Sequence, residues 1–364
     1  MMRGTRGWAT RRRLGDAGAS TIEYAGLVVA ICLVVAGLGF TPIAARAAAA
    51  TSNAFCQVFS QVDCATGTAD PSRTPYEQAT SGHYVAMGDS FSSGEGAGDY
   101  DEPTDRDDRD FADWMDSHLW WPGDREPQYH NGCHRSANAY GSIVAAENDF
   151  AGGSSFVACS GAEIHEFTDP NSGQSGEQAQ EDGLDDDTSL VTFSIGGNDL
   201  GFADILADCV LDGSTCQGKN EATFQQGLVD TKARLIATYR RIHEKAPNAR
   251  IVVVGYPRLF PADPSDNFRD LLFADSQVWM NEKADQLDTM LADAAREAGV
   301  GVEFVDPREA FEGHGLGSSD PWFNDLSVQA NGYTPVNPGS FHPNAQGQRA
   351  LADLVQEQLH HPHG

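Results

Sequence analysis

The sequence predicts a three-layer α/β/α fold in which helices cover both faces of a central parallel sheet. Two observations support this. Short, continuously apolar runs typical of buried strands recur between residues 82 and 364, and longer amphipathic stretches separate them. Strands that alternate with helices pair in parallel, because each helix carries the chain back to the same end of the sheet.

The elements follow one another in a regular order. Strands are expected at residues 84–87, 155–159, 189–195, 250–254 and 301–305, and helices at 135–148, 224–244, 275–298 and 345–359. An acidic insertion at 99–124 carries Trp114, Trp120 and Trp121, and a polar loop spans 173–187. Residues 81–364 are therefore expected to form one domain.

The first eighty residues differ from this domain. Residues 1–50 hold a basic leader and an apolar run at 24–40, which is expected to be a signal or membrane-anchoring helix with a cytoplasmic N-terminus. Residues 51–80 are expected to be a linker. The segment 18–24, with Glu23 at its fifth position after Gly18, resembles the processing site of Flp/TadE-like type IV prepilins. An ordinary signal anchor explains it equally well.

The net charge and the cysteines limit which binding partners and which cellular compartment can be expected for the protein. A net charge of −29 at pH 7 argues against nucleic acid as a partner, because a nucleic-acid-binding face is basic. Six of the seven cysteines pair most simply in order, although six cysteines allow fifteen connectivities. The expected disulfides are Cys56–Cys64, Cys133–Cys159 and Cys209–Cys216. Disulfides favour an exported protein, and the absence of C-x-x-C spacing disfavours a metal site.

Three small or polar residues follow predicted strands, and a fourth polar residue precedes the last helix. Ser90 follows the first strand, Gly161 the second and Asn198 the third, and His342 lies directly before the last helix. Carboxyl ends of parallel strands share one edge, where ligands bind in open α/β sheets. Ser90 is the candidate nucleophile and His342 its base. The N–H groups of Ser90 and Gly161 and the Asn198 amide are candidate oxyanion donors. Asp89 and Asp199 are expected to be structural acceptors.

These four blocks resemble those of the SGNH, or GDSL-type, hydrolases. The matching residues are Gly88-Asp89-Ser90, Gly161, Gly196-Gly197-Asn198-Asp199 and His342-Pro343, within about residues 80–360. The resemblance implies a flavodoxin-like sheet and hydrolysis of carboxylic esters through an acyl-enzyme on Ser90, with no metal or cofactor. It assigns His342 as base and Gly161 and Asn198 as oxyanion donors.

The chain departs from the common family pattern beside the histidine. An Asp usually stands three residues before it, and here that position is Gly339. Secreted actinobacterial members, which also carry three disulfides, are similar in this respect and use a main-chain carbonyl instead. The resemblance therefore implies a Ser–His dyad whose imidazole is oriented by the carbonyl of Gly339 or Ser340. Asp320 or Asp325 could also fold back toward His342.

The function predicted is therefore that of an exported serine ester hydrolase of the esterase or lipase type. A lipid, a glycan ester or a small ester is the expected substrate, and the N-terminal helix would tether the protein to a membrane if it is not cleaved. The alternative hypothesis is a surface or pilus-associated protein whose SGNH domain is inactive. The sequence predicts neither the natural substrate nor the oligomeric state.

Overall fold

The computed structural model describes residues 73–105, 131–174, 176–212, 215–264, 272–327 and 337–362. Its centre is a five-stranded sheet in the order β2-β1-β3-β4-β5, and all neighbouring strands are parallel. The strands are β1 (His83–Ala86), β2 (Ser154–Phe156), β3 (Thr188–Phe193), β4 (Arg250–Val254) and β5 (Val302–Val305). The predicted α/β fold class is confirmed.

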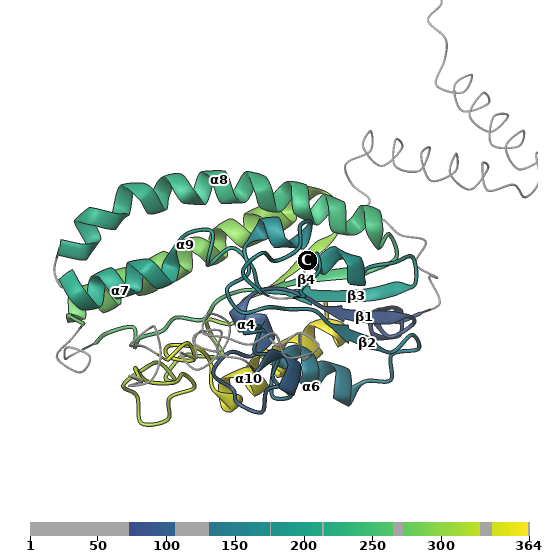
Figure 1. Cartoon of the computed structure of the whole chain (residues 1–364), viewed down its shortest axis with the longest axis horizontal. Coiled ribbons are helices and arrows are strands. Elements are labelled where there is room, and N and C mark those ends of the chain that lie inside the picture. Colours follow the sequence, from purple (N-terminus) through teal and green to yellow (C-terminus); the bar gives the residue numbers. More distant parts are fainter. Residues whose placement is uncertain are drawn as a thin grey trace, which may run out of the picture. The chain divides into compact units, whose positions relative to one another are not determined.

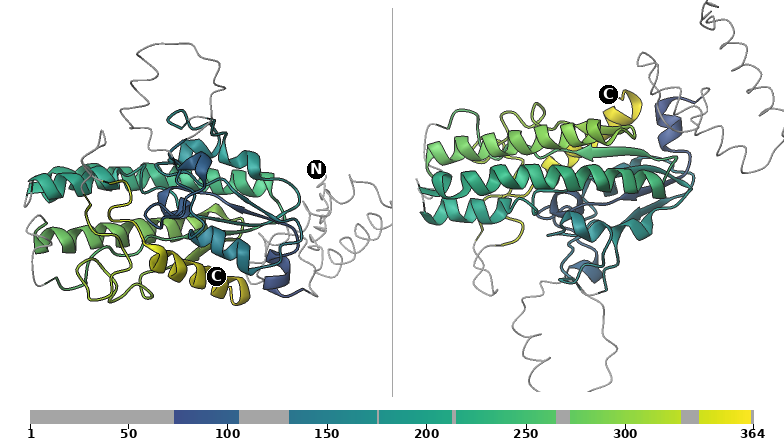
Figure 2. Two further views of the ribbon diagram at one scale, coloured as in Figure 1. Left: turned by 60° about the horizontal axis from the view of Figure 1, so that its bottom comes forward. Right: turned by 90° about the horizontal axis from the view of Figure 1, so that it is seen from above.

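Helices cover both faces of the sheet. In Figure 1, α8 and α9 lie above it, and α6 and α10 lie below. The second view of Figure 2 shows α8 and α9 running side by side. The helices are α3 (Pro75–Ala79), α4 (Ser90–Ser93), α6 (Tyr140–Glu147), α7 (Phe202–Asp212), α8 (Cys216–Lys245), α9 (Ala274–Ala298) and α10 (Ala345–His360). Short 3₁₀ helices are η1 (Glu102–Thr104), η2 (Ile164–Phe167) and η3 (Gln180–Gly183).

The strand order explains why the helices divide between the two faces. The chain passes from β1 to β2 through α6, then returns past β1 to β3 and continues through α8 and α9 to β4 and β5. Crossovers between parallel strands are right-handed, so reversing the direction of winding moves the connecting helices to the opposite face. The reversal places a topological switch point between β1 and β3, where ligands bind in open α/β sheets.

Apolar side chains from the strands and covering helices form one continuous core. Every residue of β3 is buried, and the Phe193 ring packs between Phe167 of η2 and Tyr239 of α8. Burying an aromatic side chain of this size contributes roughly 2–3 kcal/mol. The core therefore holds the strands firmly and leaves their carboxyl ends as a rigid base for the loops that follow.

Several predicted element boundaries differ from the observed ones. Strand β2 ends at Phe156 rather than at residue 159, where the disulfide from Cys159 to Cys133 fixes the path of the chain. Helix α6 begins at Tyr140 rather than at residue 135, since the backbone N–H groups of Ser136 and Ala137 donate to the carbonyls of Ser93 and Asp99. Neither reason is local, so neither could be read from a helical or strand pattern.

Three α-helices were not predicted. Helix α4 is a short helix that begins directly after Asp89. Helix α7 precedes α8, and the Cys209–Cys216 disulfide joins the two, so α8 starts at Cys216 instead of residue 224. Helix α3 lies within the expected linker 51–80. It has a capping box between Thr74 and Glu77, and it packs on α10.

Two of the three expected disulfides are present, Cys133–Cys159 and Cys209–Cys216. The third, Cys56–Cys64, lies outside the described residues, as do the basic leader and the apolar run at 24–40. Within the described ranges, no helix is both long enough and apolar enough to span a bilayer.

Candidate active site

Ser90 is positioned by a tight turn directly after β1. Gly88 has φ +117°, and a Cβ there would lie 2.5 Å from the Ser194 carbonyl oxygen, so only glycine fits. The Gln180 side chain accepts from the Gly88 N–H at 2.7 Å and donates to its carbonyl at 2.9 Å. Asp89 then caps α4, whose first residue is Ser90. The turn therefore fixes Ser90 at the carboxyl edge of the sheet.

Asp89 is a structural acceptor, as expected. Its Oδ1 accepts from the Phe91 N–H at 3.0 Å, and its Oδ2 accepts from the Tyr256 hydroxyl. Burial raises the pKa of Asp89 to about 7, against the opposing effect of the hydrogen bonds from Tyr256 and Phe91. The carboxyl group anchors the start of α4 to the loop after β4.

His342 faces Ser90 from the segment before α10. Asn344 caps that helix by accepting from the Gln346 and Gly347 N–H groups, so the residues just before it are held in a defined path. The Nε2 atom of His342 lies 2.8 Å from the Ser90 Oγ, and the Nδ1 atom lies 3.1 Å from the Ser340 carbonyl oxygen. A carbonyl can only accept. Nδ1 therefore carries the proton, and Nε2 accepts from the Ser90 hydroxyl.

The Gly339 carbonyl is not the partner of the imidazole. It accepts from the His342 backbone N–H at 3.3 Å and from the Asn324 amide at 3.2 Å. A Cβ at position 339 would lie only 2.9 Å from the Cα of Gly96. An aspartate at this position would therefore collide with the Ser90 loop, which gives a physical reason for the glycine.

The two other candidate carboxylates lie elsewhere. Asp320 pairs with His314 at 3.3 Å, and Asp325 accepts from the Leu326 N–H at 2.7 Å. The Ser340 carbonyl is the group that holds His342 Nδ1. Among the described residues, no carboxylate is hydrogen-bonded to the imidazole of His342.

The surroundings of His342 favour its neutral form. Burial lowers the pKa of His342, while the Glu95 charge and the carbonyls of Ser340 and Pro338 raise it. Burial prevails, so the pKa lies below the ordinary histidine value. The imidazole is therefore available as a proton acceptor at neutral pH.

Gly161 and Asn198 lie in two loops that are tied together at the same sheet edge. The Asn198 Nδ2 donates to the Ala162 carbonyl at 2.8 Å, and Asp199 accepts from the Ile164 N–H at 3.1 Å. Gly161 is exposed and has φ +82°. Among the described residues, the N–H groups of Ser90 and Gly161 donate to no protein acceptor. Both N–H groups are therefore candidate donors to a substrate oxygen.

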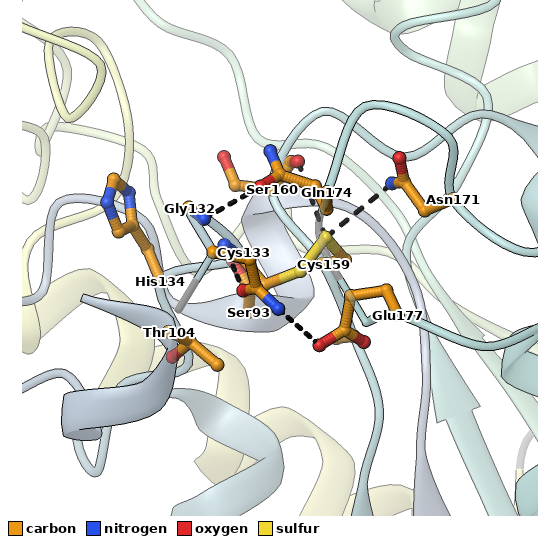
Figure 3. Close-up of a disulfide and its surroundings, with 12 residues drawn as sticks. Ser93, Thr104, Gly132, Cys133, His134, Cys159, Ser160, Asn171, Gln174 and Glu177 are labelled. Atoms are coloured by element: carbon orange, nitrogen blue, oxygen red, sulfur yellow. Dashed lines mark hydrogen bonds between the residues drawn. A yellow bond between two sulfur atoms is a disulfide. The ribbon is translucent and has the colours of Figure 1, made fainter. Parts of the chain in front are cut away.

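The Cys133–Cys159 disulfide supports the loop that carries Gly161. The Ser160 N–H donates to the Cys133 carbonyl at 3.0 Å, and the Cys159 N–H donates to the Gly88 carbonyl at 3.0 Å. Figure 3 shows the disulfide with Asn171 and Glu177 on one side and His134 on the other. The bridge therefore ties the Gly161 loop to the segment at Cys133, and the Cys159 N–H ties it to the turn that presents Ser90.

Several residues that shape the site were not predicted. Asn324 joins the Ser90 and His342 segments through hydrogen bonds to the carbonyls of Gly96 and Gly339. Gln348 of α10 donates to the Phe91 carbonyl and accepts from the Tyr140 N–H. A lone amide carries no sequence signal, because partners such as Gly96 of Asn324 and Phe91 of Gln348 lie more than two hundred residues away. Within the described ranges, no cluster of three or more His, Cys, Asp or Glu side chains could hold a metal ion.

A serine hydroxyl hydrogen-bonded to a histidine, beside unpaired backbone N–H groups, is the arrangement used by hydrolases with a serine nucleophile. Comparison with known proteins agrees. Residues 86–350 match the GDSL-like lipase/acylhydrolase family. The chain is 34% identical to Lipase 1 of Streptomyces coelicolor over 274 residues, which are 75% of this chain and 84% of that lipase. A lipase of Streptomyces rimosus is 34% identical over 283 residues, with the same two coverages.

Two solved structures are similar as well. Phospholipase A1 from Streptomyces albidoflavus gives a TM-score of 0.59 at 32% identity, covering 76% of this chain and 99% of that one. An extracellular lipase from Streptomyces rimosus gives 0.58 at 30% identity, with the same coverages. The chain belongs to the GDSL-like lipase/acylhydrolase family. It is a carboxylic ester hydrolase.

Proposed function

We propose that the protein hydrolyses carboxylic esters through an acyl-enzyme formed on Ser90, with His342 as the general base. The observation that carries this proposal is the 2.8 Å separation between Ser90 Oγ and His342 Nε2, with Nδ1 anchored on a carbonyl. A base at this distance can accept the hydroxyl proton as the oxygen attacks.

The reaction proceeds in two halves. His342 Nε2 takes the Ser90 proton while Oγ attacks the ester carbonyl carbon, and the imidazolium then gives that proton to the departing alcohol oxygen. Water next gives a proton to Nε2 and attacks the acyl carbon, and the carboxylic acid leaves as the Ser90 hydroxyl is restored. The N–H groups of Ser90 and Gly161 and the Asn198 amide hold the negative oxygen in both tetrahedral intermediates.

The Ser340 carbonyl orients the imidazole in place of an aspartate. It keeps a proton on Nδ1, so the neutral imidazole presents Nε2 to Ser90 as an acceptor at the start of the cycle. A neutral carbonyl stabilises an imidazolium less than a carboxylate does, so charge compensation has to come from elsewhere.

We favour lipid acyl esters as the substrate class. We also propose that the protein is secreted. The similar proteins are named as lipases and a phospholipase A1, and one of them is described as extracellular. Two disulfides within the domain support an oxidising compartment. Tethering through the apolar run at 24–40 stays a prediction from the sequence.

The test compares hydrolysis of p-nitrophenyl esters of increasing acyl length and of phosphatidylcholine vesicles by the full chain. We expect turnover that rises with acyl length and is abolished in Ser90→Ala. A preference for acetyl esters would instead favour glycan or small-ester substrates. A wild-type protein that neither turns over any ester nor reacts with a fluorophosphonate probe would favour the inactive surface protein.

A further inference from the structure

A buried carboxylate that the proposed reaction does not use lies beside the Ser–His pair. Glu95 is only 2% exposed, and it stands two residues after the end of α4. Its backbone N–H donates to the Ser90 carbonyl at 3.0 Å. Burying a carboxylate is costly unless it is paired and hydrogen-bonded, so its partners have to be identified.

A histidine and a tyrosine bind the Glu95 carboxylate. His134 Nδ1 lies 2.6 Å from one carboxylate oxygen, and the Tyr100 hydroxyl donates to the other at 3.4 Å. The Tyr100 ring stacks on His134, and the Gly96 N–H donates to the Tyr100 hydroxyl. Within the described part of the chain, no lysine or arginine forms an ion pair with Glu95. Its ion-pair partner in this part of the chain is His134, when the imidazole is protonated.

The segment that carries Glu95 packs directly against the segment that carries His342. A Cβ on Gly96 would lie 3.1 Å from the His342 Cβ. The Asn324 amide donates to the carbonyls of Gly96 and Gly339, at 2.8 and 3.2 Å, and so fastens the two segments together. The same close approach excludes a carboxylate at position 339.

We propose that Glu95 is a positioning residue whose carboxylate supplies, from the Ser90 loop, the negative charge that position 339 cannot provide. The charge stabilises His342 as an imidazolium when it has accepted the Ser90 proton. This inference rests on the proposed function, because it concerns the charged state of the general base.

The pKa values of the two residues agree with this arrangement. Burial raises the pKa of Glu95, but the hydrogen bond and charge of His134 and the charge of His342 prevail and lower it. Glu95 is therefore ionised at neutral pH. Among charged neighbours of His342, Glu95 raises its pKa more than His134 lowers it. Reciprocal coupling of this kind is expected for two groups that share a buried environment.

The test is the pH dependence of kcat/KM for a soluble p-nitrophenyl ester, measured for the full chain and for Glu95→Gln. Loss of the negative charge lowers the pKa of His342, so the acid limb should move to lower pH by about half a unit or more. The plateau of kcat should fall about tenfold, since the imidazolium is less stable. Glu95→Asp keeps the charge and should keep the acid limb near that of the wild type.

Glu303→Gln is the matched control. Glu303 is a part-buried glutamate that pairs with Arg250 at the amino end of β4, the opposite end of the strand from the site. The Glu303→Gln substitution should lower thermal stability without moving the acid limb of the pH profile. If Glu95→Gln does not fold, the double variant Glu95→Gln/His134→Gln replaces both partners by amides, and a smaller shift in the same direction is expected.

The outcomes separate the two proposals. A wild-type chain without esterase activity would overturn the proposed function. An active wild type would support the proposed function. If the wild type is active but a folded Glu95→Gln variant has an unshifted acid limb, only the role of Glu95 is overturned. An equal shift in Glu303→Gln would overturn that role as well, because the effect would then not depend on proximity to His342.

Discussion

His342 Nε2 lies 2.8 Å from Ser90 Oγ, although 252 residues separate them in the chain. Ser90→Ala removes the nucleophile and should lower kcat by about 10⁴-fold or more. His342→Gln removes the base and should lower kcat by about 10²–10⁴-fold. Stopped or continuous p-nitrophenyl ester assays measure both. Ser81→Ala, which removes an exposed hydroxyl bonded to the Gln78 carbonyl, is the control. Substantial turnover by Ser90→Ala would disprove the assignment.

Asn198 is expected to hold the developing oxyanion together with backbone N–H groups. Asn198→Ala should lower kcat by about 10²–10³-fold with little effect on thermal stability. Asn248→Ala is a matched control, because this exposed amide also donates to a main-chain carbonyl but lies away from the site. If the two variants lose the same small fraction of activity, Asn198 does not act on the oxyanion.

The close packing at Gly339 predicts a sensitive position. Gly339→Ala places a methyl group 2.9 Å from the Gly96 Cα, so one of the two segments has to move and His342 leaves its bonding distance from Ser90. We expect kcat to fall about tenfold or more. Gly218→Ala in α8 meets no atom within 4 Å and should be stable and fully active. A fully active Gly339→Ala variant would mean that the segments are not closely packed.

The lowered pKa of His342 sets the expected pH profile. The neutral imidazole is the base, and it is lost as pH falls through its pKa, so a lowered pKa extends activity into mildly acidic solution. The acid limb of kcat/KM should therefore lie below the ordinary histidine pKa of about 6.5. A limb above that value in the wild type would contradict the burial of His342.

The Cys133–Cys159 disulfide should matter for both stability and activity. It closes a loop with a sequence separation of 26 residues, and the lost entropy of the unfolded chain stabilises the folded state by about 3.5 kcal/mol. Cys133→Ser/Cys159→Ser should lower the free energy of unfolding by about that amount and should lower kcat, since the Gly161 loop is released. Removal of the seven-residue Cys209–Cys216 bridge should cost less, about 2.5 kcal/mol, with kcat unchanged. Denaturant unfolding of both variants measures the difference.

The periodicity of apolar residues was sufficient to predict the five strands and most covering helices, because burial on both faces of a parallel sheet imposes continuous apolar runs. It failed where tertiary contacts set the boundary. The disulfides at Cys159 and Cys216 and the backbone hydrogen bonds of Ser136 and Ala137 change the ends of β2, α8 and α6. Local propensity carries no information about such partners.

For the site, the sequence by itself determined the class of chemistry. Ser90, Gly161, Asn198 and His342 stand at element ends, where short patterns mark the change from strand to loop or from loop to helix. The tertiary structure alone decided how the histidine is held. It selected the Ser340 carbonyl over that of Gly339, and it left no room for a carboxylate there. It also brought Glu95 and Asn324 beside the dyad. The sequence could not predict this, because packing between distant segments depends on the whole fold and not on local spacing.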